Sequence, residues 1–461
     1  MVSSRLSVVE SRFPPLISHF QMMEAKMVYP YKSPKDETVG EIRARQLAKI
    51  KDYIEFAYHN TPYYRDLFDK NNIKPRDISS FDDFRRIPIT TKDDLRKQNS
   101  GFFGAPEEEW IDMSCTSGTT GESVYIPFTR NDMKRIAVWG AQTLRLSGIN
   151  ETDRIHLAMP MCAWMWMAGF GFYICFSTAG VCVLRFGPGF SGKSLEIIKN
   201  LSATAIIGVP SYLVKLGEMR ERMQIETSIK RVFTIGENIL NKDLTKNALG
   251  KKLEELWKTE VFSCYGATEG TFLGVECDRF CGHHINPDEV YVEILDPDTL
   301  EPVKDGEEGL VTITPIGARG LTLLRYVNGD MSFIIPGRCP CGRMLQRVGP
   351  VFARIDQMMK VKGVMIYPDA IKNIIAGTGK IDLFQMEAYT ENFSNLVRIY
   401  VPSYADEETD RKSAIDIRER IRLELGVTLE VKSISREILQ GMIFPPGKGK
   451  PVTFVDKRSK Q

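Results

Sequence analysis

One segment of the chain combines small polar residues in a way that suits anion binding. Residues 114–121 read Ser-Cys-Thr-Ser-Gly-Thr-Thr-Gly, so every residue except Cys115 is Ser, Thr or Gly. Glycines leave backbone N–H groups accessible and hydroxyls add donors, which favours a polyphosphate guest. This segment does not match GxxxxGK[ST], so it is not a Walker A loop. A polar surface loop that satisfies its own backbone is the alternative.

Two further segments carry carboxylates. Tyr265-Gly266-Ala267-Thr268-Glu269 follows the strand-like run EVFSC, and an aromatic ring, a glycine turn, a hydroxyl and a carboxylate there suit base stacking and Mg²⁺ binding. A strand–helix cap is the alternative. Residues 324–330, LRYVNGD, end in a turn-like Asn-Gly-Asp whose carboxylate could bind ribose hydroxyls.

Thiols and imidazoles form a separate group. Cys339-Pro340-Cys341 is a tight C-x-C pair. Further ligand-type residues lie upstream: Cys277, Cys281, His283 and His284. Thiolates with imidazole suit a closed tetrahedral Zn²⁺ site with a structural role. Free thiols near a turn are the alternative.

The elements that position these residues follow from hydrophobic patterning. Between residues 101 and 350, apolar runs such as TAIIGVP, RVFTIG and EVFSCYG alternate with helical segments. This alternation predicts an α/β fold with layered sheets and helices, a largely parallel sheet, and ligands at the carboxyl ends of its strands. Residues 290–315 predict two antiparallel strands, and residues 36–100 are helical in pattern.

The pattern changes near residue 355. Beyond it we expect a small α+β domain with two strands in a hairpin, a charged helix and a last strand. The prediction is a large domain over 1–355, with a zinc subdomain at 270–345, and a small domain over 356–461. The basic, Gly/Pro-rich tail from residue 445 is expected to be a loop outside the core.

Composition excludes several classes of protein. The 461 residues carry 61 Lys and Arg against 59 Asp and Glu, a net charge of +2 that gives no nucleic-acid footprint. Nine cysteines are too few for a disulfide framework, and the first twenty residues lack the apolar core of a secretory signal, so we expect a cytoplasmic protein. Residues 155–184 lack charges, but Pro160, Gly169, Gly171 and Gly180 interrupt them. A buried strand–helix–strand is therefore favoured over a membrane span.

In their order along the chain, the motifs resemble those of the phenylacetate–CoA ligase family of acyl-adenylate-forming enzymes, over roughly residues 40–458. TSGTTG is similar to the family's phosphate loop, YGATE to its nucleotide and Mg²⁺ motif, and TIGEN at 234–238 to its adenine-contacting segment. LRYVNGD resembles RYRTGD, and residues 353–368 resemble the hinge before the C-terminal domain. GKPVTFVDKR at 449–458 resembles the family's lysine-bearing tail.

The resemblance implies an ATP-dependent carboxylic acid–CoA ligase. It would form an acyl-adenylate with release of pyrophosphate and then transfer the acyl group to coenzyme A. The implied catalytic residues are Lys450, Glu269 and Thr268, with Asp356 as hinge. The implied nucleotide-binding residues are Ser117, Gly118, Thr119, Thr120, Gly121, Gly236, Glu237, Tyr265, Gly266, Asp330 and Arg354. A carboxylate attacking an anionic α-phosphate needs nearby cations, which Mg²⁺ on Glu269 and the Lys450 ammonium would supply.

The resemblance also implies a structural zinc. Its ligands would be Cys277, His284, Cys339 and Cys341, with Cys281 as alternate. An acid pocket walled by Trp164, Trp166 and Tyr265 would suit an aryl or arylacetic acid, although a Trp/Met stripe is also ordinary helix packing.

The chain departs from the family pattern at several positions. Glu122 stands where the family has Lys after the phosphate loop, Val327-Asn328 replace Arg-Thr, Ala353 replaces Gly and Met365 replaces Asn. Glu122 would repel polyphosphate unless it turns away, so a non-catalytic nucleotide-binding relative is one alternative. Transfer to a carrier-protein phosphopantetheine is another, because both acceptors present a thiol. A homodimer is left open.

Overall fold

The computed structural model describes residues 37–116, 123–161, 165, 167–187, 191–271, 274–355, 359–361, 364–366, 368–379, 381–391, 394–404, 406–445 and 451–458. As expected, the chain begins with helices: α2 (Val39–Asn60), α3 (Pro62–Lys70), the 3₁₀ turn η1 (Pro75–Asp77), α4 (Phe81–Arg85), α5 (Lys92–Lys97), η2 (Asn99–Phe102) and η3 (Glu107–Glu109). Thr38, Ser80 and Thr91 start three of them with capping boxes. Each box satisfies N–H groups that a helix start leaves free.

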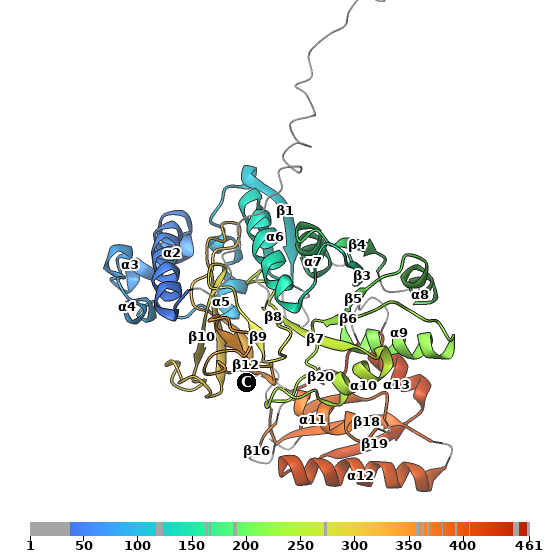
Figure 1. Ribbon diagram of the computed structural model, residues 1–461. Helices are drawn as coiled ribbons and strands as arrows, with labels where there is room; N and C mark the ends of the chain where they lie inside the picture. Colours follow the sequence, from blue (N-terminus) through green and yellow to red (C-terminus); the bar gives the residue numbers. More distant parts are fainter. Residues whose placement is uncertain are drawn as a thin grey trace, which may run out of the picture.

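The large domain is organised around an eight-stranded sheet in the order β13-β9-β8-β7-β6-β5-β3-β4 (Figure 1). Its parallel part contains β3 (Arg154–Ala158), β4 (Cys182–Arg185), β5 (Ala205–Gly208), β6 (Arg231–Thr234) and β7 (Glu260–Tyr265). Short antiparallel strands extend it: β8 (Gly274–Glu276), β9 (His283–His284) and β13 (Arg347–Val348). The predicted parallel sheet is confirmed.

Helices cover both faces of the parallel strands. Neighbouring residues of a strand point to opposite faces, so Val232 packs with α8 (Ser191–Asn200), α9 (Pro210–Arg222) and α10 (Ala248–Trp257), whereas Phe233 packs in the core that holds α6 (Arg130–Leu144) and α7 (Met167–Thr178). The charge-free stretch 155–184 is β3, α7 and β4, the strand–helix–strand that its interruptions predict. Among the described helices, none has the length and apolarity needed to cross a membrane.

A second, antiparallel sheet lies beside the first in the order β10-β11-β12-β14. Its strands are β10 (Val290–Leu295), β11 (Gly309–Pro315), β12 (Tyr326–Ser332) and β14 (Ala353–Arg354). The predicted strand pair over 290–315 is thus β10 and β11. The LRYVNGD segment is not a free turn, because its last five residues belong to β12. Two of its residues have a positive φ, Arg325 at +47° and Gly329 at +86°. A hairpin of β1 (Trp110–Cys115) and β2 (Tyr125–Thr129) leads to and from the phosphate-loop segment.

The C-terminal part has its own hydrophobic core, separate from those of the large domain. Its elements are β15 (Met359–Val361), β16 (Val364–Ile366), α11 (Pro368–Ala376), β17 (Gln385–Glu391), β18 (Ser394–Pro402), α12 (Glu407–Leu425), β19 (Glu430–Ile434), α13 (Arg436–Ile443) and β20 (Phe454–Asp456). In Figure 1 this orange and red unit lies below α9 and α10.

The expectation that the tail beyond residue 445 lies outside the core is wrong for its last described part. β20 pairs in parallel with β17, and Phe454 packs against the small domain's core. The Thr-Phe-Val run has strand propensity that its Gly- and Pro-rich surroundings conceal. Helix α13 was not predicted.

Candidate active site

The motif loops follow the carboxyl ends of the parallel strands. Residues 235–238 come after β6 and residues 266–269 after β7. Gly236 has a φ of +88° and open space where a Cβ would stand, so backbone can approach a ligand there. Glu237 accepts hydrogen bonds from the backbone N–H and hydroxyl of Ser211, 2.8 and 3.0 Å away, at the start of α9. This bond ties the TIGEN loop to the loop after β5.

Asp330 is the centre of a polar group that we call the nucleotide corner: Tyr265, Asn328, Asp330 and Arg354. Tyr265 and Asp330 are buried, whereas Arg354 is exposed. The Tyr265 hydroxyl donates to Asp330 Oδ2 at 3.0 Å, and Asn328 Nδ2 donates to the same oxygen at 3.2 Å. Arg354 Nε lies 2.8 Å from Asp330 Oδ1, and the two residues face each other across β12 and β14. Burial, and then the Asp330 charge, raise the pKa of Tyr265, which therefore stays a donor. The structure thus brings together Tyr265, Asp330 and Arg354, all implied by the resemblance.

Glu269 is connected to the same strand. The Tyr326 hydroxyl, at the start of β12, donates to Glu269 Oε1 at 3.3 Å. Tyr326 is fully buried, and burial together with the Glu269 charge raises its pKa. One strand therefore orients both carboxylates, Glu269 through Tyr326 and Asp330 directly.

A cavity of about 110 Å³ opens beside Gly266, Ala267 and Thr268. Small and apolar side chains form most of its wall, with Thr268, Thr271 and Glu289 as polar exceptions. The remaining lining residues are Ile136, Gly140, Met167, Ala168, Gly171, Phe172, Cys175 and Ile235. Thr268 is therefore at the cavity, whereas Tyr265, which was expected in the acid pocket, is not among the lining residues. The part of the chain after residue 161 contributes lining residues to this cavity through α7.

Several predicted residues lie outside the described residues. They are Ser117, Gly118, Thr119, Thr120, Gly121 and the neighbouring Glu122, the pocket candidates Trp164 and Trp166, the hinge residue Asp356 and the lysine Lys450. The strand before the phosphate-loop segment is described. Ser114 Oγ, on β1, donates to the carbonyl oxygen of Met165 at 2.6 Å, which brings the loop's first flank beside the start of α7.

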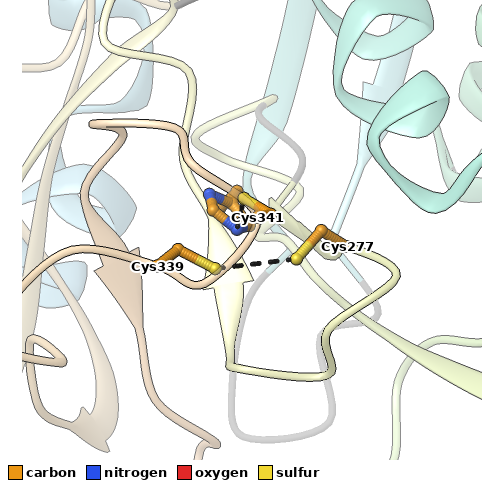
Figure 2. Close-up of side chains that lie close together, drawn as sticks. Cys277, Cys339 and Cys341 are labelled. Atoms are coloured by element: carbon orange, nitrogen blue, oxygen red, sulfur yellow. Dashed lines mark hydrogen bonds between the residues drawn. The ribbon is translucent and has the colours of Figure 1, made fainter. Parts of the chain in front are cut away.

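The four implied zinc ligands form a compact group, here called the Cys/His cluster: Cys277, His284, Cys339 and Cys341. Their ligand atoms all lie within 4.8 Å of one another. Cys277 Sγ is 3.8 Å from Cys339 Sγ, and Cys341 Sγ is 3.7 Å from His284 Nε2 (Figure 2). Burial opposes the charged form of Cys341, yet the hydrogen bond with His284 lowers its pKa. Three soft thiols and an imidazole nitrogen are a donor set that suits tetrahedral Zn²⁺.

The neighbouring candidates have other partners. His283 Nε2 lies 2.9 Å from Ser263 Oγ, and its Nδ1 lies 3.2 Å from the Val348 carbonyl oxygen, so its ring is used between strands. Cys281 Sγ bonds to the Arg279 carbonyl at 3.0 Å, outside the cluster. Adjacent positions on a strand point to opposite faces, which explains why His284 and not His283 faces the thiols.

Sequence reasoning missed three residues of this region. Tyr326 and Asn328 lie within the quoted LRYVNGD motif, but nothing in the sequence assigned their side chains to Glu269 and Asp330. Glu289 reaches the cavity from the position just before β10, twenty residues beyond the YGATE motif. No local signal marks it, because only the crossing of the two sheets places it there.

Comparisons with known proteins agree with this geometry. The model of the AMP-binding enzyme family matches residues 83–318, slightly more than half of the chain. The phenylacetate–coenzyme A ligase of Thermus thermophilus is 29% identical over 348 residues, covering 74% of this chain and 77% of that protein. The enzyme of the same name from Escherichia coli is 27% identical over 433 residues, covering 92% and 96%.

A solved structure shares the fold over nearly the whole length. The structure of 2-hydroxyisobutyryl-CoA ligase in the postadenylation state, in complex with 2-HIB-AMP, has a TM-score of 0.80 and 20% sequence identity, and covers 98% of this chain and 95% of its own. The chain belongs to the AMP-binding enzymes, within the phenylacetate–CoA ligase family of the acyl-adenylate-forming superfamily.

Proposed function

We propose that this protein is an ATP-dependent carboxylic acid–CoA ligase that works through an acyl-AMP intermediate and releases pyrophosphate. The observation that carries the proposal is the arrangement on β12, where Asp330 and Tyr326 connect the nucleotide corner to Glu269 beside an apolar cavity. The relatives named phenylacetate–coenzyme A ligase support it.

In the first half-reaction, a carboxylate oxygen of the acid attacks the α-phosphorus of ATP and pyrophosphate leaves. Asp330 would accept hydrogen bonds from the ribose hydroxyls while Tyr265 and Asn328 hold its second oxygen in place. Glu269 would hold Mg²⁺, whose charge offsets the repulsion between the two anions. In the second half-reaction, the thiolate of coenzyme A attacks the acyl carbonyl and AMP leaves.

The Lys450 ammonium would serve the first half-reaction only, with rotation of the small domain about Asp356 removing it before thiol attack. Support comes from the residues that flank its loop. Val452 N donates to the Ile443 carbonyl at 2.8 Å, so the described residues on either side of that segment are held together. Beside these residues, Lys215 of α9 lies 4.6 Å from the centre of the Phe444 ring, a contact between the two domains. A contact of this exposed kind is weak enough to exchange during rotation.

The Cys/His cluster would hold a structural Zn²⁺. Its four ligands come from β8's end, β9 and the 339–341 loop, so a bound ion would join segments more than sixty residues apart. All four positions of a tetrahedral site are supplied by protein, which leaves none open for substrate and separates this site from catalysis.

Aryl or arylacetic acids are the proposed substrates. The mostly apolar wall of the cavity supports this proposal, because an aromatic ring is favoured by apolar neighbours. Coenzyme A is the proposed acceptor, with a carrier-protein phosphopantetheine as the alternative thiol. Glu122 favours the non-catalytic alternative, which the following experiment also tests.

Pyrophosphate release from MgATP across a panel of acids, with and without coenzyme A, tests the proposal. Release with one acid, increased by coenzyme A and abolished in Lys450→Ala, is the expected result. Release that ignores coenzyme A would favour another acceptor. ATP binding without release for any acid would favour the non-catalytic relative.

A further inference from the structure

The turn after β7 is fixed at its middle and at its end. Thr271 N donates to the carbonyl oxygens of Ala267 at 2.9 Å and Thr268 at 3.3 Å, which closes a turn over residues 267–271. In the middle of this turn, Glu269 accepts a hydrogen bond from the Tyr326 hydroxyl at 3.3 Å. The end of the turn, Thr271, is held from a different part of the fold, helix α6.

This turn connects the two parts of the proposed site that must meet during adenylation. Ala267, Thr268 and Thr271 line the cavity proposed to receive the acid, here called the acid cavity. Glu269, the proposed Mg²⁺ ligand, lies between them in the sequence. A shift of the turn would therefore move the bound acid relative to the metal ligand. In-line attack tolerates little such movement, because the reacting atoms must be held in a near-attack geometry.

Thr271 has a backbone conformation that its residue type disfavours. Its φ is +45°, in the left-handed region that favours glycine. A β-branched residue in this region costs free energy and persists only where the surrounding structure fixes it. The two backbone hydrogen bonds of Thr271 fix it from within the turn. Its side chain adds a contact from outside, because Thr271 Oγ1 accepts a hydrogen bond from Arg135 Nη2.

Arg135, on α6, makes this contact from a buried position. The residue is 7% exposed, and neither its Nε nor its Nη1 has a hydrogen-bond partner among the described residues. The bond to Thr271 is thus the one hydrogen bond of this guanidinium within the described part of the chain. Burying a charged side chain with so few partners costs free energy, so the stability of α6 does not account for Arg135.

We infer that Arg135 is a positioning residue for the proposed reaction: its hydrogen bond with Thr271 fixes the turn over residues 267–271, and with it the wall of the acid cavity and Glu269. This inference rests on the proposed function. Asp330 is held by its own partners, Tyr265, Asn328 and Arg354, and none of these bonds involves the turn. Loss of Arg135 should therefore impair use of the acid and the chemical step more than binding of ATP.

Arg135→Met tests the inference, because methionine keeps most of the aliphatic stem and removes every donor. We would measure steady-state pyrophosphate release while varying first the acid that gives the fastest release and then MgATP. KM for the acid should rise by about tenfold or more and kcat should fall, whereas KM for ATP should change by less than about threefold. An unfolded fraction would lower kcat alone, so the rise in KM for the acid separates positioning from stability.

Thr271→Val removes the acceptor of the same hydrogen bond and keeps the branched shape. It should raise KM for the acid as Arg135→Met does. The double variant should lose no more than the larger single change, because both substitutions remove one interaction. Thr271→Ser keeps the hydroxyl and should retain a KM close to that of the wild type. Arg130→Met is the matched control, since Arg130 is exposed on the same helix, and both KM values should remain unchanged.

Three results would overturn the inference and leave the ligase function standing. They are an unchanged KM for the acid in Arg135→Met, an equal rise in KM for ATP, and additive effects of Arg135→Met and Thr271→Val. Failure of the wild type to release pyrophosphate with every acid would instead overturn the proposed function, and this inference with it.

Discussion

In the nucleotide corner, Asp330 is buried among protein partners: a tyrosine hydroxyl, an amide and a guanidinium surround its two oxygens. In the Cys/His cluster, three thiols and one imidazole face mainly one another. Asp330 and most of the cluster's residues are buried, but Asp330 has protein partners, whereas three thiols and an imidazole would be stabilised by a bound cation. A site that binds and releases substrates needs hydrogen-bond partners that can rearrange. A site that only joins segments of the chain can use an ion that stays bound.

The largest effect should follow removal of the zinc proposed for the Cys/His cluster. We expect about one zinc per chain in the wild type and its loss in Cys339→Ser. The large domain should lose about 4 kcal/mol or more of its free energy of unfolding, because the buried thiols lose the charge that compensates them. Metal analysis and thermal melting with and without a strong chelator measure both.

Cys281→Ser is the matched control for that experiment. Cys281 lies nearby but bonds to the Arg279 carbonyl outside the cluster. It should keep its metal and melt within a few degrees of the wild type. Equal metal loss in both variants would mean that the ligand set is wrongly assigned.

Glu269→Gln tests the other region. Removing the carboxylate proposed to hold Mg²⁺ should lower the rate of pyrophosphate release by about 10²–10³-fold, the usual scale for one electrostatic group at a reacting centre. Single-turnover kinetics with saturating MgATP measure it. Tyr326→Phe, which removes only the hydroxyl that orients Glu269, should cost about tenfold or less. A larger loss from Tyr326→Phe than from Glu269→Gln would contradict this order.

The effect of low pH on stability has a contribution from His156, which lies outside both regions and must be separated from any effect on the Cys/His cluster. His156, on β3, is fully buried, and burial lowers its pKa to about 4 from 6.5. Between these two pH values, His156 therefore binds a proton in the unfolded chain but not in the folded chain. Stability from this residue is complete above pH 6.5 and falls by about 1.4 kcal/mol per pH unit between 6.5 and 4.

Urea unfolding of His156→Gln between pH 4 and 6.5 should show a smaller change in the free energy of unfolding per pH unit than the wild type shows. Any loss that remains, and that added zinc reverses, would come from protons competing with the metal for the cluster's ligands. An unchanged slope in His156→Gln would show that the imidazole is already protonated in the folded chain.

The sequence predicted where the motifs lie in the fold better than it predicted which side chains contact them. Parallel strands with loops at their carboxyl ends follow from apolar runs closed by glycine, so the placement of YGATE after β7 and TIGEN after β6 was expected. The pairing of Tyr326 with Glu269, or of Glu289 with the acid cavity, depends on how two sheets cross, which no local pattern encodes. The β20 strand was missed for a related reason, since its short Thr-Phe-Val run becomes a strand only when β17 is beside it.

Asp330→Asn should have a moderate effect. The amide keeps the shape but removes the charge that faces Arg354 and would accept the ribose hydroxyls. We expect KM for ATP to rise by about tenfold or more, with a smaller change in kcat, since hydrogen bonds to charged groups contribute about 1.5–3 kcal/mol. Steady-state kinetics with ATP as the varied substrate measure this. An equal rise in KM for the acid would instead indicate a general distortion of β12.

The smallest effect should come from Asn328→Thr, which restores the residue type of the family motif. Asn328 Nδ2 lies 2.8 Å from the Tyr265 hydroxyl oxygen and 3.2 Å from Asp330 Oδ2. Threonine can keep at most one of these contacts, but Tyr265 and Arg354 still hold the carboxylate, so KM for ATP should change by less than about threefold. Because several protein groups hold the Asp330 carboxylate in place, one amide can be replaced without loss of the site. A tenfold change would mean that Asn328 itself contacts the nucleotide, and that the corner depends on one group, as we propose that the Cys/His cluster depends on a zinc ion.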